Sequence, residues 1–306
     1  MELRVLQYFL AVAREQSIVR AAESLHLSQP TLSTQIKAME ESLGKQLLIR
    51  GTKGSRKITL TEEGMILRKR AEEILNLVQK TEQEITSSDQ FIAGDVYIGT
   101  GETDAVRFIA KTARELYQTY PGIHYHISSG NAQFVIEQLE KGLIDFGIVL
   151  GFKDYGKYHY IELPFKDTWG VLMRRDSPLA EKESVHPEDL WEKPLIISQQ
   201  DGICGTLTSW IQKEISELEI AATYNLLFNA SLMVEEGLGY AVGLDKIINT
   251  SGSSSLCFRP LAPRRETSMS IVWKKYQVFS KASEKFIQKM KEMSGRYINE
   301  KNRCPD

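Results

Sequence analysis

Polar side chains that could hydrogen-bond to the edges of DNA bases follow a serine near the start of the chain. They lie in the stretch SIVRAAESLHLSQPTLSTQIKAMEESL, residues 17–43. Ser28 suits the N-cap of a helix, and Pro30 falls in its first turn, where a missing N–H costs nothing. Gln, Ser and Thr can bond base edges in the major groove, and Lys can meet a phosphate. The candidate DNA contacts in this helix are Ser28, Gln29, Pro30, Thr31, Ser33, Thr34 and Lys37.

Two short helices joined by a tight turn must present these side chains. The sequence predicts the turn at His26-Leu27-Ser28, and we interpret His26 as a turn residue and no ligand. Apolar residues at helical spacing would bury the other face of both helices. They are Ile18, Ala21, Ala22 and Leu25, followed by Leu32, Ile36, Met39 and Leu43. Alone, this pattern fits an ordinary helical hairpin with a solvated polar face as well as it fits a DNA-binding helix-turn-helix.

The flanking segments favour the DNA-binding interpretation. An amphipathic helix is expected before the pair, and Leu47–Arg50, the loop GTKGSRK and Ile58–Leu60 predict a strand, a basic loop and a returning strand. Arg50, Lys53 and Arg56 in this wing suit contacts to phosphate or to the minor groove. Residues 1–70 hold twelve Lys and Arg against seven Asp and Glu, although the whole chain has a formal net charge of -2. We therefore predict a winged helix-turn-helix DNA-binding domain over residues 1–60.

A long helix is predicted from Thr61 to about Ser87. Its apolar stripe alternates four- and three-residue spacings, which is a heptad seam. The seam consists of Leu67, Ala71, Ile74, Val78, Thr81 and Ile85. Such a stripe often packs against its own domain, but this helix leaves a small domain, so we favour self-pairing into a dimer that spaces two recognition helices. Residues 61–90 are thus expected to form a linker and dimerisation helix.

Strands and helices alternate from Gly94 onward. Strands are expected at 96–98, 123–127 and 146–150, with helices at 104–119 and 131–142. A second block has expected strands near 168–173, 195–198, 223–227 and 268–273, helices at 206–217 and 230–237, and a final helix from about Ser280. This rhythm implies a parallel sheet with helices on both faces.

The loop GTGETD, residues 99–104, comes close to a dinucleotide-binding fingerprint. Two requirements of that site fail: Asp104 stands where the third glycine is needed, and the next strand ends in Ser128-Ser129-Gly130-Asn131, without an acid for a ribose. The sequence also lacks a zinc-protease helix, a nucleophile elbow and a phosphate loop. We expect no enzyme, no catalytic residue, no cofactor and no metal.

The chain resembles the LysR-type transcriptional regulators. The resemblance rests on SIVRAAESLHLSQPTLSTQIKAMEESLGKQLLIR, ITLTEEG and GDVYIG, and it covers essentially the whole chain. It implies an α+β multidomain fold, in which the winged helix-turn-helix and the linker helix precede an effector-binding regulatory domain at 91–306. This domain would contain two α/β subdomains hinged like periplasmic binding proteins, with crossovers near 162–168 and 262–268. Two features depart from the family: Thr34 replaces the usual Arg, and the wing between Arg50 and Leu60 looks longer.

The expected effector site lies where strands end. Ligands of open α/β sheets bind beyond the carboxyl ends of strands, and a helix start there offers N–H groups to an anion. This rule brings together residues 100–103, 128–131 and 149–151, and the resemblance adds 198–200 and Asn229. The expected contacts are Thr100, Gly101, Glu102, Thr103, Ser128, Ser129, Asn131, Val149, Gly151, Ser198, Gln199 and Asn229. Glu102 would repel an anion and favour an amine-bearing ligand, or else point to solvent; Trp169 is expected in the core or beside the cleft.

The resemblance also implies partners. These are double-stranded promoter DNA, an unidentified small-molecule effector, RNA polymerase, and further copies of the chain, as a homodimer through the linker helix and a homotetramer. No apolar run approaches the roughly 18 residues of a membrane span, and the N-terminus lacks a signal-peptide layout, so we expect the cytoplasm and no membrane partner. An odd cysteine count fits a reducing compartment, and Cys204, between two glycines, is a weak candidate redox sensor. The competing class is a plain small-molecule binding protein or transport component.

Overall fold

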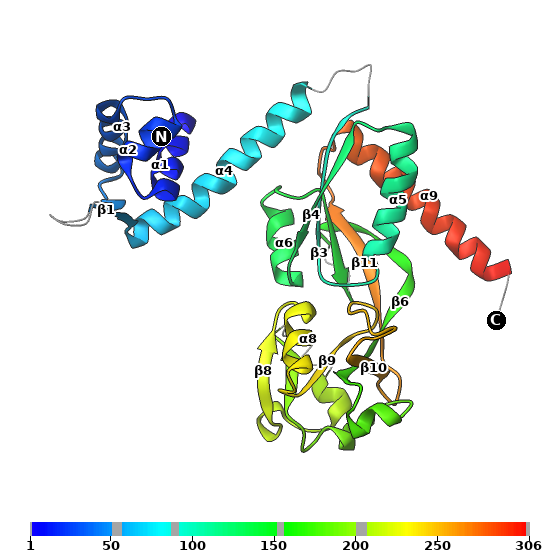
Figure 1. Cartoon of the computed structure of the whole chain (residues 1–306). Helices are drawn as coiled ribbons and strands as arrows, with labels where there is room; N and C mark the ends of the chain where they lie inside the picture. Colours follow the sequence, from blue (N-terminus) through cyan, green and yellow to red (C-terminus); the bar gives the residue numbers. More distant parts are fainter. Residues whose placement is uncertain (1, 51–56, 87–91, 152–155, 200–206, 304–306) are drawn as a thin grey trace. The chain divides into compact units, whose positions relative to one another are not determined.

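The computed structural model describes residues 2–50, 57–86, 92–151, 156–199 and 207–303. The chain forms two compact units, Met1–Thr86 and Ser87–Asp306, which we call the head and the sensor (Figure 1). Each unit has its own buried core, so each is described by itself. Cys204, Lys53, Arg56 and Gln200 lie outside the described residues.

The head is a helical domain with a two-stranded wing. Its elements are α1 (Leu3–Glu15), α2 (Ile18–Ser24), α3 (Gln29–Leu43), β1 (Leu48–Arg50), β2 (Ile58–Leu60) and α4 (Glu62–Thr86), and β1 pairs antiparallel with β2. The predicted inward faces of α2 and α3 are confirmed at Ala21, Leu32 and Ile36, which are fully buried. Leu43 is exposed, against the prediction, because α3 ends there and Gly44 turns the chain away with φ +64°. His26 has φ +54°, which fits its expected place in the turn.

The stripe along α4 divides between two environments. Ala71 is fully buried in the head, and Leu67 and Ile74 pack against the same core. Farther along, Thr81 is exposed and Ile85 is 78% exposed. The first half of the predicted seam therefore stabilises the head itself, and the second half presents apolar side chains at its surface.

The sensor contains a mixed sheet, not the parallel one that the sequence predicts. Its strands are β3 (Gly94–Thr100), β4 (Ile123–Ser129), β5 (Phe146–Leu150), β6 (Tyr158–Arg174), β7 (Leu195–Ser198), β8 (Ile220–Tyr224), β9 (Tyr240–Leu244), β10 (Leu256–Pro260) and β11 (Glu266–Lys274). Their order is β4-β3-β5-β11-β6-β9-β7-β8, and β10 also pairs with β6. Pairs β3–β4, β3–β5, β7–β8 and β7–β9 are parallel. The long strand β6 runs antiparallel to its neighbours β11 and β9, and β11 runs antiparallel to β5.

Strand β6 makes the first crossover as one continuous strand. Its residues up to Thr168 pair with β11 in the first subdomain, and those from Trp169 onward pair with β9 and β10 in the second. The chain returns between β10 and β11, through residues 261–265. Strand β10 was not predicted; it ends shortly before the expected second crossover.

Helices cover both subdomains. They are α5 (Val106–Thr119), α6 (Ala132–Glu140), α8 (Leu227–Glu235) and α9 (Lys281–Arg303), with short 3-10 turns η1 (Pro178–Glu181), η2 (Pro187–Asp189) and η3 (Ile215–Glu217). The predicted helix 206–217 is wrong in extent: residues 207–211 are helical, and Gln212 then breaks the helix with φ +58°. Strand β8 and helix α8 each begin three residues earlier than predicted. For α8 the reason is a cap that comes from elsewhere in the chain, as described below.

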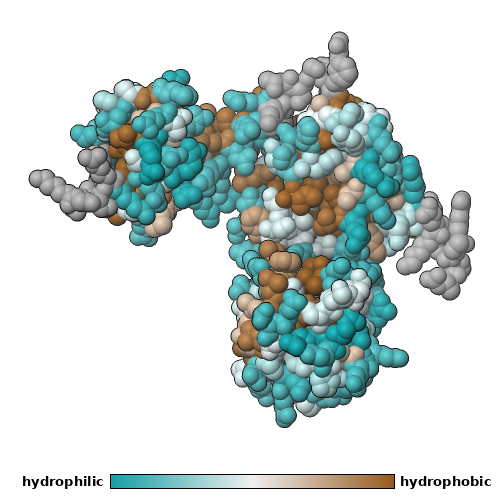
Figure 2. Space-filling view, viewed as in Figure 1, coloured by the Kyte–Doolittle hydropathy of each residue, from teal (hydrophilic) through white to brown (hydrophobic). Residues whose placement is uncertain are grey.

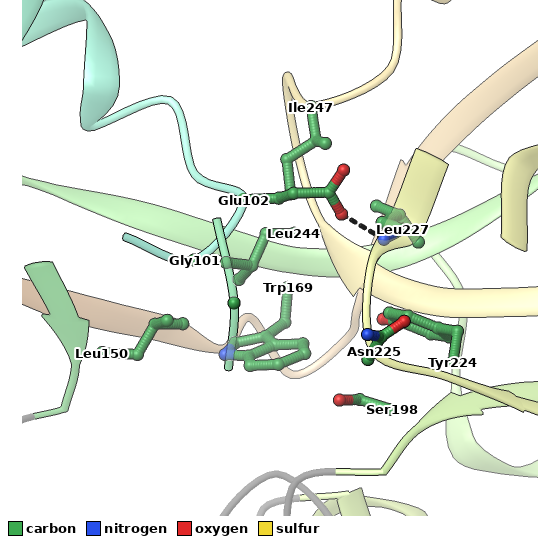
Figure 3. A pocket seen from close by; sticks show the side chains of 11 residues that line it. Gly101, Glu102, Leu150, Trp169, Ser198, Tyr224, Asn225, Leu227, Leu244 and Ile247 are labelled. Atoms are coloured by element: carbon green, nitrogen blue, oxygen red, sulfur yellow. Dashed lines mark hydrogen bonds between the residues drawn. The ribbon is translucent and has the colours of Figure 1, made fainter. Parts of the chain in front are cut away.

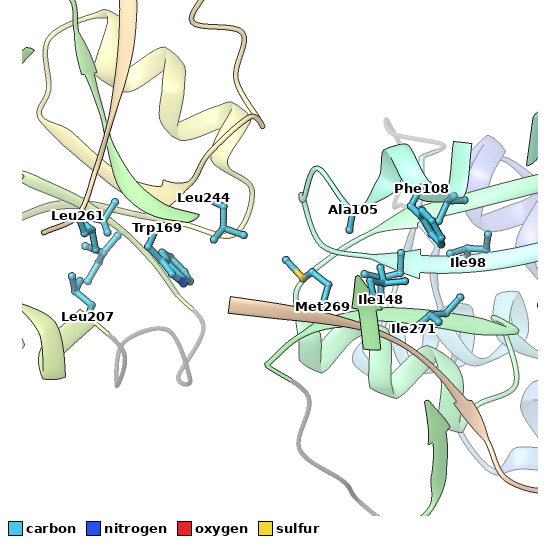
Figure 4. Close-up of a cluster of buried hydrophobic side chains, with 14 of the residues drawn as sticks. Ile98, Ala105, Phe108, Ile148, Trp169, Leu207, Leu244, Leu261, Met269 and Ile271 are labelled. Atoms are coloured by element: carbon cyan, nitrogen blue, oxygen red, sulfur yellow. The ribbon is translucent and has the colours of Figure 1, made fainter. Parts of the chain in front are cut away.

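Buried apolar side chains gather in both subdomains of the sensor. Figure 4 shows one group around Ile98, Ile148 and Met269 and another around Trp169 and Leu244. Apolar side chains also reach the surface on α8, where Phe228, Leu232 and Met233 are exposed (Figure 2). Each of the two subdomains therefore has a packed interior, and their strand ends meet between the two.

Candidate functional site

The first candidate site is the exposed face at the start of α3. Ser28 caps the helix, since its Oγ accepts the Thr31 N–H at 3.3 Å and lies 2.7 Å from the Thr31 hydroxyl. Leu32 on the opposite side is fully buried, which fixes the rotation of the helix. The predicted contacts Ser28, Gln29, Pro30, Thr31, Thr34 and Lys37 are exposed, and Ser33 is half-buried. The arrangement can present hydroxyl, amide and ammonium groups to a polyanion.

The wing is attached to α3 through a glutamate. The Glu40 carboxylate, on the inner side of α3, accepts the N–H groups of Leu47 at 2.8 Å and Leu48 at 3.1 Å. Thr61, between β2 and α4, donates its hydroxyl to the Gln46 carbonyl at 2.7 Å, and the same hydroxyl accepts the Gly64 N–H at 3.0 Å. These bonds fix the positions of helix α3, the wing and the start of α4 relative to one another. Of the wing cations, Arg50 ends β1, and the other two predicted contacts fall in the part of the chain that is not described.

Gly64 is required where α4 begins against the wing. A Cβ at this position would lie 2.2 Å from the Leu47 carbonyl oxygen, closer than real Cβ contacts occur. The glycine of the ITLTEEG motif thus permits α4 to touch the backbone of the wing. Its role is packing, and it needs no contact with DNA.

The second candidate site is a cleft between the strand ends of the two subdomains (Figure 3). The cavity has a volume of about 40 Å³, and its lining residues are Gly101, Glu102, Gly130, Leu150, Trp169, Ser198, Tyr224, Asn225, Leu227, Leu244 and Ile247. Gly101, Glu102 and Ser198 were predicted there, and Trp169 lines the cleft while remaining 6% exposed. Ser198, Trp169 and Tyr224 point into the cavity from different strands.

A wider groove adjoins the cleft on the other side of the loop that follows β3. It has a volume of about 380 Å³ and lies between this loop, the start of α5 and the segment after β9. Five of the predicted effector contacts line it: Thr100, Gly101, Glu102, Thr103 and Ser129. Lys246 and the Arg107–Asp104 ion pair, at 2.5 Å, supply charge at its rim. Glu102 borders both spaces.

Several predicted effector residues have local structural roles, and five of them lie away from the cleft. The Thr103 hydroxyl donates to Asp167 at 2.5 Å, and Asn131 Oδ1 caps α6 by accepting the Phe134 N–H at 2.8 Å. Val149, Gly151, Gln199, Asn229 and Ser128 do not line the cleft. Val149 is buried in a core, Gly151 is a turn with φ +55°, Gln199 donates to the Thr223 hydroxyl, Asn229 is an exposed residue of α8, and Ser128 is exposed on β4.

Most of the residues that sequence reasoning missed lie in the second subdomain. Tyr224 ends β8 and Asn225 follows it, and Leu244 ends β9, so the strand-end rule that found Gly101 applies to them as well. Leu150 lies within the predicted range 149–151 but was not named as a contact; it lines the cleft and its neighbours Val149 and Gly151 do not, because alternate residues of a strand face opposite sides. The cleft is therefore more apolar on its second wall than predicted.

Glu102 is the charged group of the cleft, and it does not point to solvent. Its Oε2 accepts the Leu227 N–H, and its Oε1 lies 3.4 Å from the Phe228 nitrogen, at the start of α8 (Figure 3). Tyr224 donates its hydroxyl to the Val242 carbonyl at 2.7 Å, and its pKa is raised by burial and then by the charge of Glu102. Nearby, burial raises the pKa of Asp167, while the Thr103 hydroxyl bond opposes that shift.

A metal centre and a membrane span would be alternative kinds of site. Within these residues no group of three or more His, Cys, Asp or Glu side chains could hold a metal ion. None of the helices in the described part of the chain is long and apolar enough to cross a bilayer. Burial raises the pKa of the Cys257 thiol, which makes it a poor nucleophile.

Comparisons with known proteins cover both units. Residues 3–65 match the family model "Bacterial regulatory helix-turn-helix protein, lysR family", and residues 90–295 match "LysR substrate binding domain". The chain is 28% identical to the uncharacterized HTH-type transcriptional regulator YvbU of Bacillus subtilis, over 96% of this chain and 99% of that one. It is 31% identical to the DNA-binding transcriptional dual regulator OxyR of Escherichia coli, over 67% of this chain and 65% of that one.

Solved structures agree with the fold. The structure of full-length CbnR complexed with its target DNA matches with a TM-score of 0.75 at 20% identity, over 95% of this chain and 99% of that one. A full-length OxyR variant from Pseudomonas aeruginosa matches with a TM-score of 0.56 at 24% identity, over the same shares. The named relatives are transcriptional regulators and not enzymes. The chain belongs to the LysR family and is a DNA-binding transcriptional regulator with an effector-binding domain.

Proposed function

We propose that the start of α3 reads the base edges of a promoter. The observation that carries this proposal is the division of α3 into a fully buried apolar side and an exposed polar N-terminal half. Gln29 and Thr31 have the groups that bond base edges, and Lys37 has the charge that meets a phosphate. The first 60 residues would form the DNA-binding domain, with Arg50, Lys53 and Arg56 of the wing as backbone contacts.

Two copies of the chain would bind a two-fold site. The second half of the α4 stripe, where Val78 is half-buried and Ile85 is exposed, supports pairing of linker helices within residues 61–90. On the sensor, Phe228 and Leu232 lie one helical turn apart on α8 and supply further apolar surface for a homotetramer. A regulator that works on chromosomal DNA would act in the cytoplasm.

The sensor, residues 91–306, would bind a small-molecule effector in its cleft. Polar groups from both subdomains converge there, namely Gly101, Glu102 and Ser198, beside the apolar wall of Trp169 and Leu244. Because the cavity is only about 40 Å³, a metabolite needs the two subdomains to separate before it can enter. Such a ligand shifts the conformational equilibrium only as far as it binds one arrangement better than the other.

Fluorescence anisotropy with DNA from the region upstream of the gene for this chain tests the DNA-reading proposal. Gln29→Ala should weaken specific binding by roughly 5- to 100-fold, the value of one good base contact, and should change non-specific binding little. Gln7→Ala, the same substitution at an exposed position of α1, is the matched control. Equal losses for both DNAs would remove Gln29 from base reading, and absence of sequence preference at physiological salt would refute the proposed role of α3.

A further inference from the structure

Helix α8 begins without a capping side chain of its own. Leu226 occupies its N-cap in extended backbone, makes no side-chain cap, and no acidic residue lies in the first turn. The first N–H groups of a helix have no acceptor within the helix, and Ser, Thr, Asp or Asn usually supplies one. Helix α8 therefore needs an acceptor from another part of the chain.

Glu102 supplies that acceptor from the other subdomain. It lies in the loop after β3, 125 residues before Leu227, and its carboxylate accepts the Leu227 N–H and reaches the Phe228 N–H. A negative group suits the positive end of the helix dipole, and bonds from N–H groups to a carboxylate are stronger than neutral ones. The contact thus meets both the hydrogen-bonding and the electrostatic needs of α8.

The contact bridges the cleft, so it exists only when the subdomains are close. Glu102 follows strand β3, in the part of the sheet with β4 and β5, and Leu227 follows strand β8, in the part with β7 and β9. The two parts are joined by β6 and by residues 261–265, about which the subdomains would hinge. Separation of the subdomains removes the carboxylate from α8 and leaves its first N–H groups to water. The bond therefore favours the closed arrangement.

On the cleft side of this contact there is no room for a second anion. The cavity beside the carboxylate, about 40 Å³, holds roughly one water molecule. Trp169, Leu244 and Leu150 give its walls an apolar character, and the charge of Glu102 contributes to raising the pKa of Tyr224. A free carboxylate would have to displace Glu102 from α8 and lie against its charge.

We propose that Glu102 is a latch, a side chain that holds the sensor closed by occupying the start of α8 as a built-in anion. The latch also selects the effector. A ligand that leaves the bond between Glu102 and α8 in place is neutral or positively charged where it faces Glu102, and small carboxylates are excluded from the start of α8. This inference rests on the cleft being the effector site, and it names the ligand class for that site.

Hydrogen exchange in the full-length protein, read by mass spectrometry over the first turn of α8, tests the latch. Glu102→Ala should speed exchange of the Leu227 and Phe228 amides about tenfold, which corresponds to roughly 1.4 kcal/mol. Added acetate should slow this exchange again in the variant, because it can occupy the vacated position, and chloride at equal ionic strength should not. Wild-type exchange should be the same with acetate and with chloride. Glu137→Ala, at an exposed position of α6, is the matched control and should leave α8 unchanged.

The outcomes separate clearly. Unchanged exchange in Glu102→Ala, or slowing by acetate of the wild type as much as of the variant, overturns the latch. Should Glu102→Ala fail to fold, Glu102→Gln, which keeps an oxygen but no charge, must still speed exchange severalfold; unchanged exchange there refutes the proposal. None of these measurements involves DNA, so a failed latch leaves the promoter-binding proposal intact, and a failed anisotropy experiment leaves the latch intact.

Discussion

Replacing Glu40 by Gln should loosen the wing from the recognition helix. The Glu40 carboxylate accepts two backbone N–H groups of the wing, those of Leu47 at 2.8 Å and Leu48 at 3.1 Å. Both leucine side chains are buried, so their N–H groups have little access to water as a substitute acceptor. The amide oxygen of Gln can still accept, but without the charge that strengthens both bonds.

The expected cost follows from these two bonds. A hydrogen bond to a charged group contributes about 1.5–3 kcal/mol and a neutral one about 0.5–1.5 kcal/mol, so the change costs roughly 1 kcal/mol per bond, or about 2 kcal/mol in total. For a unit the size of the head, each kcal/mol shifts the midpoint of thermal unfolding by about 4–8 °C. Glu40→Gln should therefore lower the unfolding temperature of the head by roughly 8–16 °C and weaken DNA binding.

The distribution of tryptophan makes the two units separable in one experiment. All four tryptophans, Trp169, Trp191, Trp210 and Trp273, belong to the sensor. Tryptophan fluorescence therefore follows the sensor alone, while far-ultraviolet circular dichroism follows both units. Glu40→Gln should shift part of the dichroism transition and leave the fluorescence transition in place.

The neighbouring residue provides the control for this substitution. Glu41 is exposed, and its carboxylate lies 3.5 Å from Lys37, an ion pair worth about 0.3–0.5 kcal/mol. Glu41→Gln should shift the unfolding of the head by at most about 4 °C. Equal shifts for the two variants, or a fluorescence transition that moves with the dichroism, would refute the reasoning.

Three further predictions concern other parts of the structure. Gly64→Ala forces a Cβ to within 2.2 Å of the Leu47 carbonyl and should cost roughly 1–3 kcal/mol by urea unfolding, whereas Gly295→Ala, with open space in α9, should be neutral or stabilising. Burial raises the pKa of Tyr125 to about 12, and its hydroxyl has no partner among the described residues. Tyr125→Phe should leave the free energy of unfolding unchanged or raise it by up to about 1 kcal/mol, and a lower free energy of unfolding would contradict this. Burial raises the pKa of Asp167 above its ordinary value of 3.8, so this carboxyl binds its proton more tightly in the folded protein than in the unfolded chain. Its contribution to the free energy of unfolding therefore falls as pH rises through the raised pKa. Asp167→Asn should thus gain stability relative to the wild type across that window in melts between about pH 4 and 8, and a pH-independent difference would exclude the effect.

The head could be predicted because its determinants are local. Ser28 and Pro30 indicate where α3 starts, and Leu32 and Ile36, one turn apart, indicate which side of it is buried. Periodicity could not say what the stripe on α4 packs against, because Ala71 inside the head and Ile85 on the surface follow the same spacing. The partner of an apolar side chain is a property of the tertiary structure.

The strand-end rule predicted one wall of the cleft, and the family resemblance predicted Ser198 on the other. Gly101 follows the rule, but the register of β5 decides which of Val149, Leu150 and Gly151 faces the cleft, because a difference of one residue reverses the face. Glu102 illustrates the larger limit. Its acceptor role depends on N–H groups 125 residues away, on a helix whose own sequence lacks a cap. Without knowledge of that contact, the start of α8 could not be placed at Leu227.

The strength of the latch limits how the sensor can respond. Moving a two-state equilibrium from 1:99 to 99:1 requires a ligand to distinguish the two states by about 5.5 kcal/mol, whereas a capping carboxylate at a helix start contributes about 2 kcal/mol at most. The Glu102 contact therefore biases the sensor toward closure without locking it. An effector must supply the remaining difference through contacts with both walls, such as Ser198 and Trp169 on one and Gly101 on the other. A ligand that binds only one subdomain would touch the same groups in both arrangements, and it could not switch the regulator however tightly it bound.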